Sequence, residues 1–301
     1  MHAAIELQEL TKTYGSRRGL AGLSLEVRQG EVFGYLGPNG AGKSTTIRLL
    51  LDLIRPTGGT ARVLGLDPRS QCAELHRRIG YLAGDFVVDG RQTAAECLTF
   101  LGNLRGGVSK ARIDALAERL GLDTSAKIKS LSKGNRQKVG LIQAFMHRPE
   151  LLILDEPTSG LDPLVQQTFL DLVREANDNG QTVFMSSHIM SEVEAVADRV
   201  AIIREGALVA LDTVADLRAR SFLDVRITFA APVEAADFAA LPGLTDLAVE
   251  GTVLTCRVTG SPDPLIKAAA RHTITGLRAD QPDLEEVFFD YYNGKETRRA
   301  A

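Results

Sequence analysis

The stretch from Gly37 to Ser44 holds glycines, a lysine and a serine at the spacing G-x-x-x-x-G-K-[ST] of a phosphate-binding loop. The residues expected to line this loop are Gly37, Pro38, Asn39, Gly40, Ala41, Gly42, Lys43, Ser44 and the following Thr45. Glycines let the backbone curl so that successive N–H groups point into one concavity, and a helix start adds its positive end. We expect Lys43 to reach the β- and γ-phosphates of a nucleotide, and the Ser44 hydroxyl to coordinate a Mg²⁺ ion between them. The alternative is a glycine-rich turn that carries a lysine by chance, but every fixed position of the motif is filled.

Two adjacent carboxylates, Asp155 and Glu156, end an apolar run that starts at Leu151. A carboxylate at such a strand end can hold Mg²⁺, and a second one can polarise the water that attacks a phosphate. We therefore expect Asp155 to be a metal ligand and Glu156 to be the catalytic base. Taken alone, the pair has a simpler interpretation as solvated charges at a strand end.

Short apolar runs alternate with segments of helical periodicity through the part of the chain that carries these residues. Runs too short and too apolar for surface helices predict strands buried on both faces at 32–36, 151–155 and 182–186. Helices are predicted at 45–53, 131–146 and 164–175. This alternation predicts an α/β fold with a largely parallel sheet.

Two further features complete the predicted first domain. The alternating run 23–27 and a strand at 61–64 predict an antiparallel β part beside the main sheet. Helical periodicity over 93–120 and 131–146 predicts a helical insert that covers about residues 85–146.

The composition changes beyond Ser221, so we place a domain boundary there, with residues 1–220 and 221–301 as the two domains. The pattern predicts strands near 225–229, 244–249, 253–258 and 274–278, with helices at 233–241 and 263–272. The order β-α-β-β-α-β is the ferredoxin-like arrangement of a small α+β domain. A last helix is predicted from Leu284 to Tyr291, with one apolar face that must dock on another surface.

The totals for the 301 residues limit the possible partners. With 35 basic and 38 acidic residues, the chain has no broad excess of positive charge, so we expect no nucleic-acid partner. The cysteines Cys72, Cys97 and Cys256 are too few and scattered for a disulfide framework and fit a reducing cytoplasm. No window approaches the roughly 20 apolar residues of a membrane span, so a partner would have to hold the chain at a membrane.

Five motifs in one order give the chain a resemblance to the ATP-binding subunits of ABC transporters, over about residues 5–220. Residues 37–44 are similar to the Walker A loop of that family, 151–156 to Walker B with its catalytic glutamate, and 159–162 to the D-loop. The segment Leu131–Asn135 resembles the family signature Leu-Ser-Gly-Gly-Gln, and His188 the switch histidine. This order of motifs disfavours both the reading of Asp155 and Glu156 as solvated charges and a P-loop kinase.

The resemblance assigns roles to single residues. It implies that Tyr14 stacks on adenine, although a tyrosine in a loop is more often half-buried packing. It implies that Ser132 and Gly134 face the γ-phosphate, that Asp162 belongs to the nucleotide site, and that His188 acts beside Glu156.

The chain departs from the family pattern at two places. Lys133 and Asn135 stand in the signature where the family has glycine and glutamine. Near Gly84, where the family usually has a glutamine that senses Mg²⁺ and the membrane subunit, no glutamine is present. Either the backbone of Gly84 or the carboxylate of Asp85 substitutes for this glutamine, or the link between the nucleotide site and the membrane subunit is looser.

The resemblance implies an ATPase with a P-loop fold that binds ATP and Mg²⁺. It implies a homodimer in which each ATP lies between the phosphate loop of one subunit and the signature of the other. The C-terminal domain resembles accessory domains on subunits that serve ABC-2 type permeases for drug or antibiotic export. We therefore expect the chain at the cytoplasmic face of the cell membrane, attached through a separate permease. The alternative is a soluble ABC ATPase that acts in translation or DNA repair.

Overall fold

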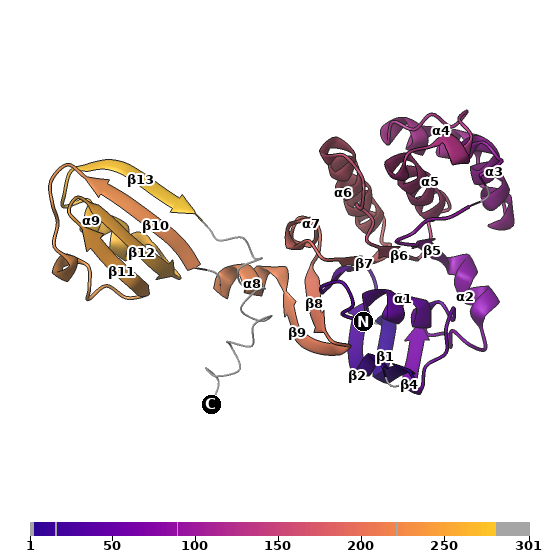
Figure 1. Ribbon diagram of the computed structural model, residues 1–301, viewed down its shortest axis with the longest axis horizontal. Helices are drawn as coiled ribbons and strands as arrows, with labels where there is room; N and C mark the ends of the chain where they lie inside the picture. Colours follow the sequence, from indigo (N-terminus) through magenta and orange to yellow (C-terminus); the bar gives the residue numbers. More distant parts are fainter. Residues whose placement is uncertain (1–2, 16, 89, 221, 281–301) are drawn as a thin grey trace. The chain divides into compact units, whose positions relative to one another are not determined.

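The chain has two compact units in the computed structural model, residues 1–212 and 213–301. Residues 3–280 are described, apart from 16, 89 and 221 (Figure 1). The contacts thus divide the chain before helix α8 (Val214–Arg220). The domain boundary after Arg220 stays a prediction.

A six-stranded sheet with the order β5-β6-β7-β3-β8-β9 forms the centre of the first unit. Its strands are β3 (Val32–Leu36), β5 (Ile79–Leu82), β6 (Leu151–Asp155), β7 (Thr182–Ser187), β8 (Arg199–Arg204) and β9 (Ala207–Thr213). Neighbours from β5 through β8 pair in parallel, as the alternation of strands and helices predicts. Every residue of β3, β6 and β7 is buried, because helices and strands cover both faces of the sheet.

An antiparallel sheet with the order β2-β1-β4 packs beside it and confirms the predicted antiparallel part. Its strands are β1 (Ala3–Tyr14), β2 (Arg17–Arg28) and β4 (Gly58–Val63). Helix α1 (Lys43–Leu50) begins and ends earlier than the predicted helix over 45–53. Both sheets and α1 contribute to one buried cluster that includes Leu23, Phe33 and Ile47.

Three helices of the predicted insert gather on one side of the large sheet (Figure 1). They are α3 (Ala94–Leu104), α4 (Lys110–Arg119) and α5 (Lys133–Phe145); α2 (Cys72–Arg78) precedes β5, and a 3₁₀ turn, η1 (Ile128–Ser130), precedes α5. A capping box between Thr93 and Glu96 starts α3. Helix α5 approaches β5 closely at Gly80, where an added Cβ would lie 2.2 Å from the carbonyl oxygen of Ala144.

Two helices follow strands of the large sheet. Helix α6 (Pro163–Asp178) comes after β6, and α7 (Met190–Glu194) comes after β7. The carboxyl ends of parallel strands meet at one edge of a sheet, which is where ligands bind in open α/β folds. The ends of β3, β6 and β7 therefore bring the phosphate loop, the carboxylate pair and His188 to the same edge.

The second unit contains one antiparallel sheet with the order β11-β12-β10-β13. Its elements are β10 (Phe222–Phe229), η2 (Ala235–Asp237), β11 (Leu244–Glu250), β12 (Val253–Thr259), α9 (Asp263–Ala269) and β13 (Ile274–Asp280). The predicted helix over 233–241 is wrong, because only the 3₁₀ turn η2 forms there. Pro232 and Pro242 bound a segment too short to offset the cost of helix nucleation, and Phe238 is held by burial instead.

The predicted helix from Leu284 to Tyr291 lies outside the described residues. Within the described residues, no helix has the length and apolar character that a membrane span requires.

Candidate functional site: a phosphate loop beside two carboxylates

The loop between β3 and α1 curls around the ammonium group of Lys43. Gly42 has φ +113°, a backbone conformation that favours glycine, and an added Cβ there would lie 2.8 Å from the carbonyl oxygen of Gly19. Lys43 is only 5% exposed, and its Nζ donates to the carbonyl oxygens of Gly37 at 2.6 Å and Pro38 at 3.4 Å. Ala41 closes the turn with an N–H bond of 3.1 Å to Pro38. The loop therefore fixes the position of its own cation.

A cavity of about 440 Å³ opens over this loop. Nine of the residues expected from the sequence line it: Tyr14, Pro38, Asn39, Gly40, Gly42, Lys43, Ser44, Thr45 and Glu156. Arg17, Arg18, Gly19 and Arg48 line it as well, and the sequence analysis missed all four. The adjacent arginines Arg17 and Arg18, which follow Tyr14 after two intervening residues, are a signal that could have pointed to an anionic ligand.

Tyr14 lies at the rim of the cavity and is 45% exposed. Its ring packs against Gly19, where an added Cβ would lie 2.9 Å from Cε2. The ammonium of Lys12 lies 5.1 Å from the ring centroid, within the range of a cation–π contact. One edge of the ring is thus fixed while a large part of it stays open to the cavity, a geometry that suits stacking on a base.

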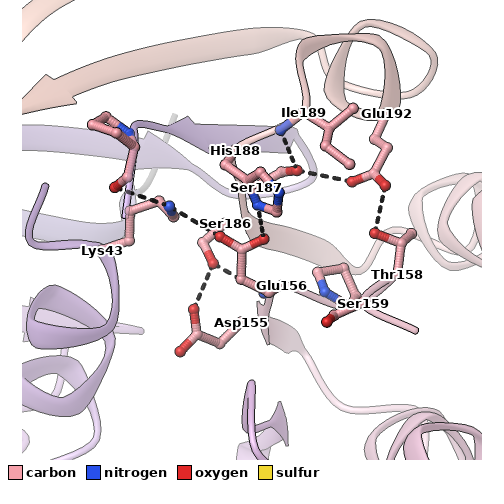
Figure 2. A network of polar contacts seen from close by, with 12 residues as sticks. Lys43, Asp155, Glu156, Thr158, Ser159, Ser186, Ser187, His188, Ile189 and Glu192 are labelled. Atoms are coloured by element: carbon pink, nitrogen blue, oxygen red, sulfur yellow. Dashed lines mark hydrogen bonds and ion pairs between the residues drawn. The ribbon is translucent and has the colours of Figure 1, made fainter. Parts of the chain in front are cut away.

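Glu156 lies between Lys43 and His188 (Figure 2). Its Oε1 is 2.9 Å from Lys43 Nζ, and its Oε2 is 2.6 Å from His188 Nδ1. An ionised carboxylate can only accept, so His188 donates from Nδ1. The backbone of Glu156 has φ +48°, which is uncommon for a residue with a Cβ and is found where surrounding contacts enforce it.

Ser186 at the end of β7 holds both carboxylate residues in place (Figure 2). Its hydroxyl donates to Asp155 Oδ1 at 2.6 Å and accepts from the backbone N–H of Glu156 at 3.1 Å. Asp155 is 5% exposed, so this hydrogen bond partly compensates a buried charge. One serine from a neighbouring strand therefore orients the metal-ligand candidate and supports the strained backbone of the base.

A third carboxylate, Glu192 on α7, connects the loop after Glu156 to the loop that carries His188 (Figure 2). It accepts from Thr158 Oγ1 at 2.5 Å and from Ser187 Oγ at 2.8 Å. Ser187 in turn accepts from the N–H of Ile189 at 3.0 Å. Glu192 is buried, so these bonds fix the two loops relative to each other.

Ser132, Gly134 and Asp162 lie outside the lining of this cavity. Ser132 caps α5 by accepting from Asn135 N–H at 3.2 Å, and Asp162 caps α6 by accepting from Val165 N–H at 3.0 Å. The start of α5 lies against the segment after Glu156, because an added Cβ at Gly134 would lie 2.5 Å from Gly160 O. Lys133 Nζ lies 3.3 Å from Ser159 Oγ, so this departure from the family signature contacts the D-loop segment.

This arrangement can bind the phosphates of a nucleotide and accept a proton from water, which are the two requirements of a P-loop nucleotide hydrolase. The profile of the ABC transporter family matches residues 20–159. The chain belongs to this family, as an ATP-binding subunit, and it is an ATPase.

Relatives support this assignment over different lengths of the chain. The linearmycin resistance ATP-binding protein of Bacillus subtilis (strain 168) is 33% identical over 302 residues, which cover 95% of this chain and 97% of that protein. The bacitracin transport ATP-binding protein of Bacillus licheniformis is 41% identical over 211 residues, 69% of each chain. The daunorubicin/doxorubicin resistance ATP-binding protein of Streptomyces peucetius is 40% identical over 220 residues, 71% of this chain and 67% of that protein.

A solved structure of an ATP-binding subunit of an ABC transporter has a TM-score of 0.66 and 30% identity, covering 71% of this chain and 92% of that one. Together with the transport and resistance proteins, it gives the alternative in translation or DNA repair no support. The fold class predicted from the sequence, an α/β ABC ATPase domain with a mixed sheet, is confirmed.

Proposed function

We propose that this subunit hydrolyses ATP with Mg²⁺ to energise a separate membrane permease of the ABC-2 type, which exports an antibiotic, a drug or a lipid-like compound. The observation that carries the proposal is the similarity to the linearmycin resistance protein over 95% of the chain, which includes the C-terminal unit. The shorter matches to bacitracin and daunorubicin/doxorubicin proteins support the same class of cargo.

The residues present suit Mg²⁺ because they offer hard oxygen donors. Ser44 lines the cavity, and Asp155 uses one oxygen for Ser186 and keeps the second available. Mg²⁺ prefers such hydroxyl, carboxylate and phosphate oxygens. When bound, it would neutralise the charge that develops on the β- and γ-phosphates.

The ion pair between Lys43 and Glu156 suggests how ATP binding prepares the base. A γ-phosphate that takes the place of the carboxylate beside Lys43 would leave the Glu156 carboxylate with its hydrogen bond from His188. The carboxylate could then accept a proton from the attacking water, with the ring of His188 fixing its orientation.

The proposed active form is a head-to-tail homodimer. Ser132 and Gly134 at the start of the 13-residue helix α5 lie outside the nucleotide cavity of their own chain. A helix start is favourable for an anion, so the signature of a second copy can complete the ATP site.

The permease is expected to dock beside α2 and α3, which would hold the subunit at the cytoplasmic face of the cell membrane. Leu53, Phe100 and Leu104 are apolar and more than half exposed there. Leu53 also lines a small cavity of about 100 Å³ with Leu51, His76, Ile79, Tyr81 and Arg105. Exposed apolar side chains of this kind are typical of a protein interface.

Co-purification from a detergent extract tests this function. A tagged chain should capture an integral membrane protein whose presence raises the ATPase rate. Phe100→Asp with Leu104→Asp should reduce the capture, whereas Leu277→Asp in the second unit, at 54% exposure, is a matched control. Capture of ribosomes or DNA in place of a membrane protein would contradict the proposal.

Gly84→Gln is expected to preserve or raise the ATPase rate of the isolated subunit and to change permease-stimulated activity more strongly. An added Cβ at Gly84 would lie 3.5 Å from Asp155 O and Oδ2, an ordinary contact, so glutamine can reach the site. Gly84 is not among the glycines with positive φ, so glutamine can adopt the backbone conformation found there. Asp85→Ala should lower both activities if Asp85 replaces the missing glutamine. ATPase rates with and without reconstituted permease measure this, and unchanged stimulation in both variants would show that the loop carries no coupling.

Truncation after Arg220 is expected to leave a folded fragment that still binds ATP. Among the described residues, the lining of the nucleotide cavity comes from residues 14–156, and the second unit has a buried cluster of its own around Phe229 and Phe238. Nucleotide binding and thermal unfolding of the fragment check this. Aggregation would show that the removed residues cover apolar surface of the ATPase unit.

A further inference from the structure

A second cavity, of about 390 Å³, lies where the loop from α3 to α4 meets the end of α5. Its lining shares no residue with the lining of the nucleotide cavity. The residues around it are Arg105, Gly107, Val108, Ser109, Arg112, Met146, His147 and Arg148. Within the described part of the chain, this lining includes three arginines and a histidine but no carboxylate.

The positive charge in this cavity is poorly compensated. Burial, and then the charges of Arg148 and Arg119, lower the pKa of Arg112. Among the described residues, no hydrogen-bond partner is present for the buried Nε of Arg112. Glu175, whose negative charge acts in the opposite direction on the pKa of Arg112, is already engaged by Arg119 in two hydrogen bonds of 2.7 and 2.6 Å. The guanidinium groups of Arg112 and Arg148 therefore lie near each other without the carboxylate that usually accompanies them. Arg105, the third arginine of the lining, donates to the backbone carbonyl oxygens of His76 and Ile79.

His147 contributes a polar wall and no charge at neutral pH. Its Nε2 donates to the carbonyl oxygen of Ile79 at 3.2 Å. Burial, together with the charge of Arg105, lowers the pKa of His147 to about 4. An anion in the cavity would stabilise the protonated ring and raise this pKa, which gives a spectroscopic signal of occupancy.

We propose that this cavity is a binding site for a phosphate group, supplied either by a small free phosphate or by the headgroup of an anionic phospholipid. Planar guanidinium groups match the oxygens of phosphate in geometry and charge. The cavity is open to solvent and is lined by several cations, which suits a multiply charged anion. Ser109 also caps the ten-residue helix α4 at the cavity wall, so the start of that helix adds a favourable potential.

The test uses the full chain with Lys43→Ala, so that phosphate binding by the nucleotide loop is weakened. Calorimetry with pyrophosphate should detect binding to this protein. Arg112→Gln with Arg148→Gln should weaken it at least tenfold, because both guanidinium groups are lost. Arg77→Gln, an exposed arginine on the neighbouring helix α2, is the matched control and should leave binding unchanged.

Three further measurements separate ligand binding from a structural effect. Pyrophosphate should raise the melting temperature of the Lys43→Ala protein and not that of the variant without Arg112 and Arg148. It should also raise the pKa of His147 in an NMR titration. Without ligand, the double replacement should not lower the melting temperature, since it removes repulsion between like charges.

Vesicles distinguish the two sources of phosphate. Sedimentation with phosphatidylglycerol vesicles but not phosphatidylcholine vesicles, lost on replacement of Arg112 and Arg148, would assign the site to a lipid headgroup. Binding of pyrophosphate alone would assign it to a free phosphate. Binding of neither probe, or binding that survives loss of both arginines, would overturn the proposal.

Discussion

Glu156→Gln is expected to lower the rate of ATP hydrolysis roughly hundredfold to ten-thousandfold, the usual contribution of a general base, while ATP still binds. Glutamine keeps the shape of the side chain but cannot accept a proton from water. The ion pair with Lys43 is lost, yet Lys43 keeps its hydrogen bonds to Gly37 and Pro38 and stays directed at the phosphates. Because bound ATP is not hydrolysed, a dimeric, ATP-bound form of the protein should accumulate.

Steady-state hydrolysis, equilibrium ATP binding and size-exclusion chromatography measure the three parts of this prediction. Glu150→Gln is the matched control, because Glu150 forms an exposed ion pair with Arg78 away from the nucleotide cavity. This control should hydrolyse ATP at the normal rate. Lys43→Ala should instead weaken ATP binding itself. Near-normal hydrolysis by Glu156→Gln, alone or with its permease, would remove Glu156 from the role of base.

The sequence predicted the parts of this site that depend on local patterns. Strand β3 and strand β6 have the bounds expected from their apolar runs, because each is short, buried on both faces and followed directly by a residue of the site. The phosphate loop could be predicted equally well, since its glycines and lysine occur in one continuous segment. Such features need no knowledge of how distant segments pack.

The contacts that orient Glu156 could not be predicted in this way. Ser186 reaches Asp155 and Glu156 only because β6 and β7 are neighbours in the sheet, with Asp155 paired to Ser186. Glu192 binds both Thr158 and Ser187, and it lies 34 residues after Thr158 in the sequence. A serine or a glutamate at these positions has no distinctive sequence signal, because its function arises from tertiary packing.

Mixing Lys43→Ala subunits with Ser132→Arg subunits is expected to restore ATPase activity that neither homodimer has. In the proposed head-to-tail dimer, each site combines the phosphate loop of one chain with the signature of the other. The mixed dimer then has one site with both defects and one site with none. Arginine at position 132 would remove the serine cap of α5 and place a bulky cation at the helix start, opposite in sign to the anion preferred there.

The experiment requires heterodimers that can be isolated, with a different affinity tag on each variant. Purification through both tags, followed by measurement of hydrolysis, should give roughly half the wild-type rate per dimer if the two sites act independently. A mixture of Lys43→Ala and Glu156→Gln subunits is the control and should stay inactive. Lys43 and Glu156 lie in the same cavity of one chain, so each of the two sites in this mixed dimer has a defective cavity although both signatures are intact. Inactivity of the first mixture, despite isolated heterodimers, would contradict independent composite sites, since Ser132 lies outside the cavity that contains Lys43 and can complete a site only in another copy.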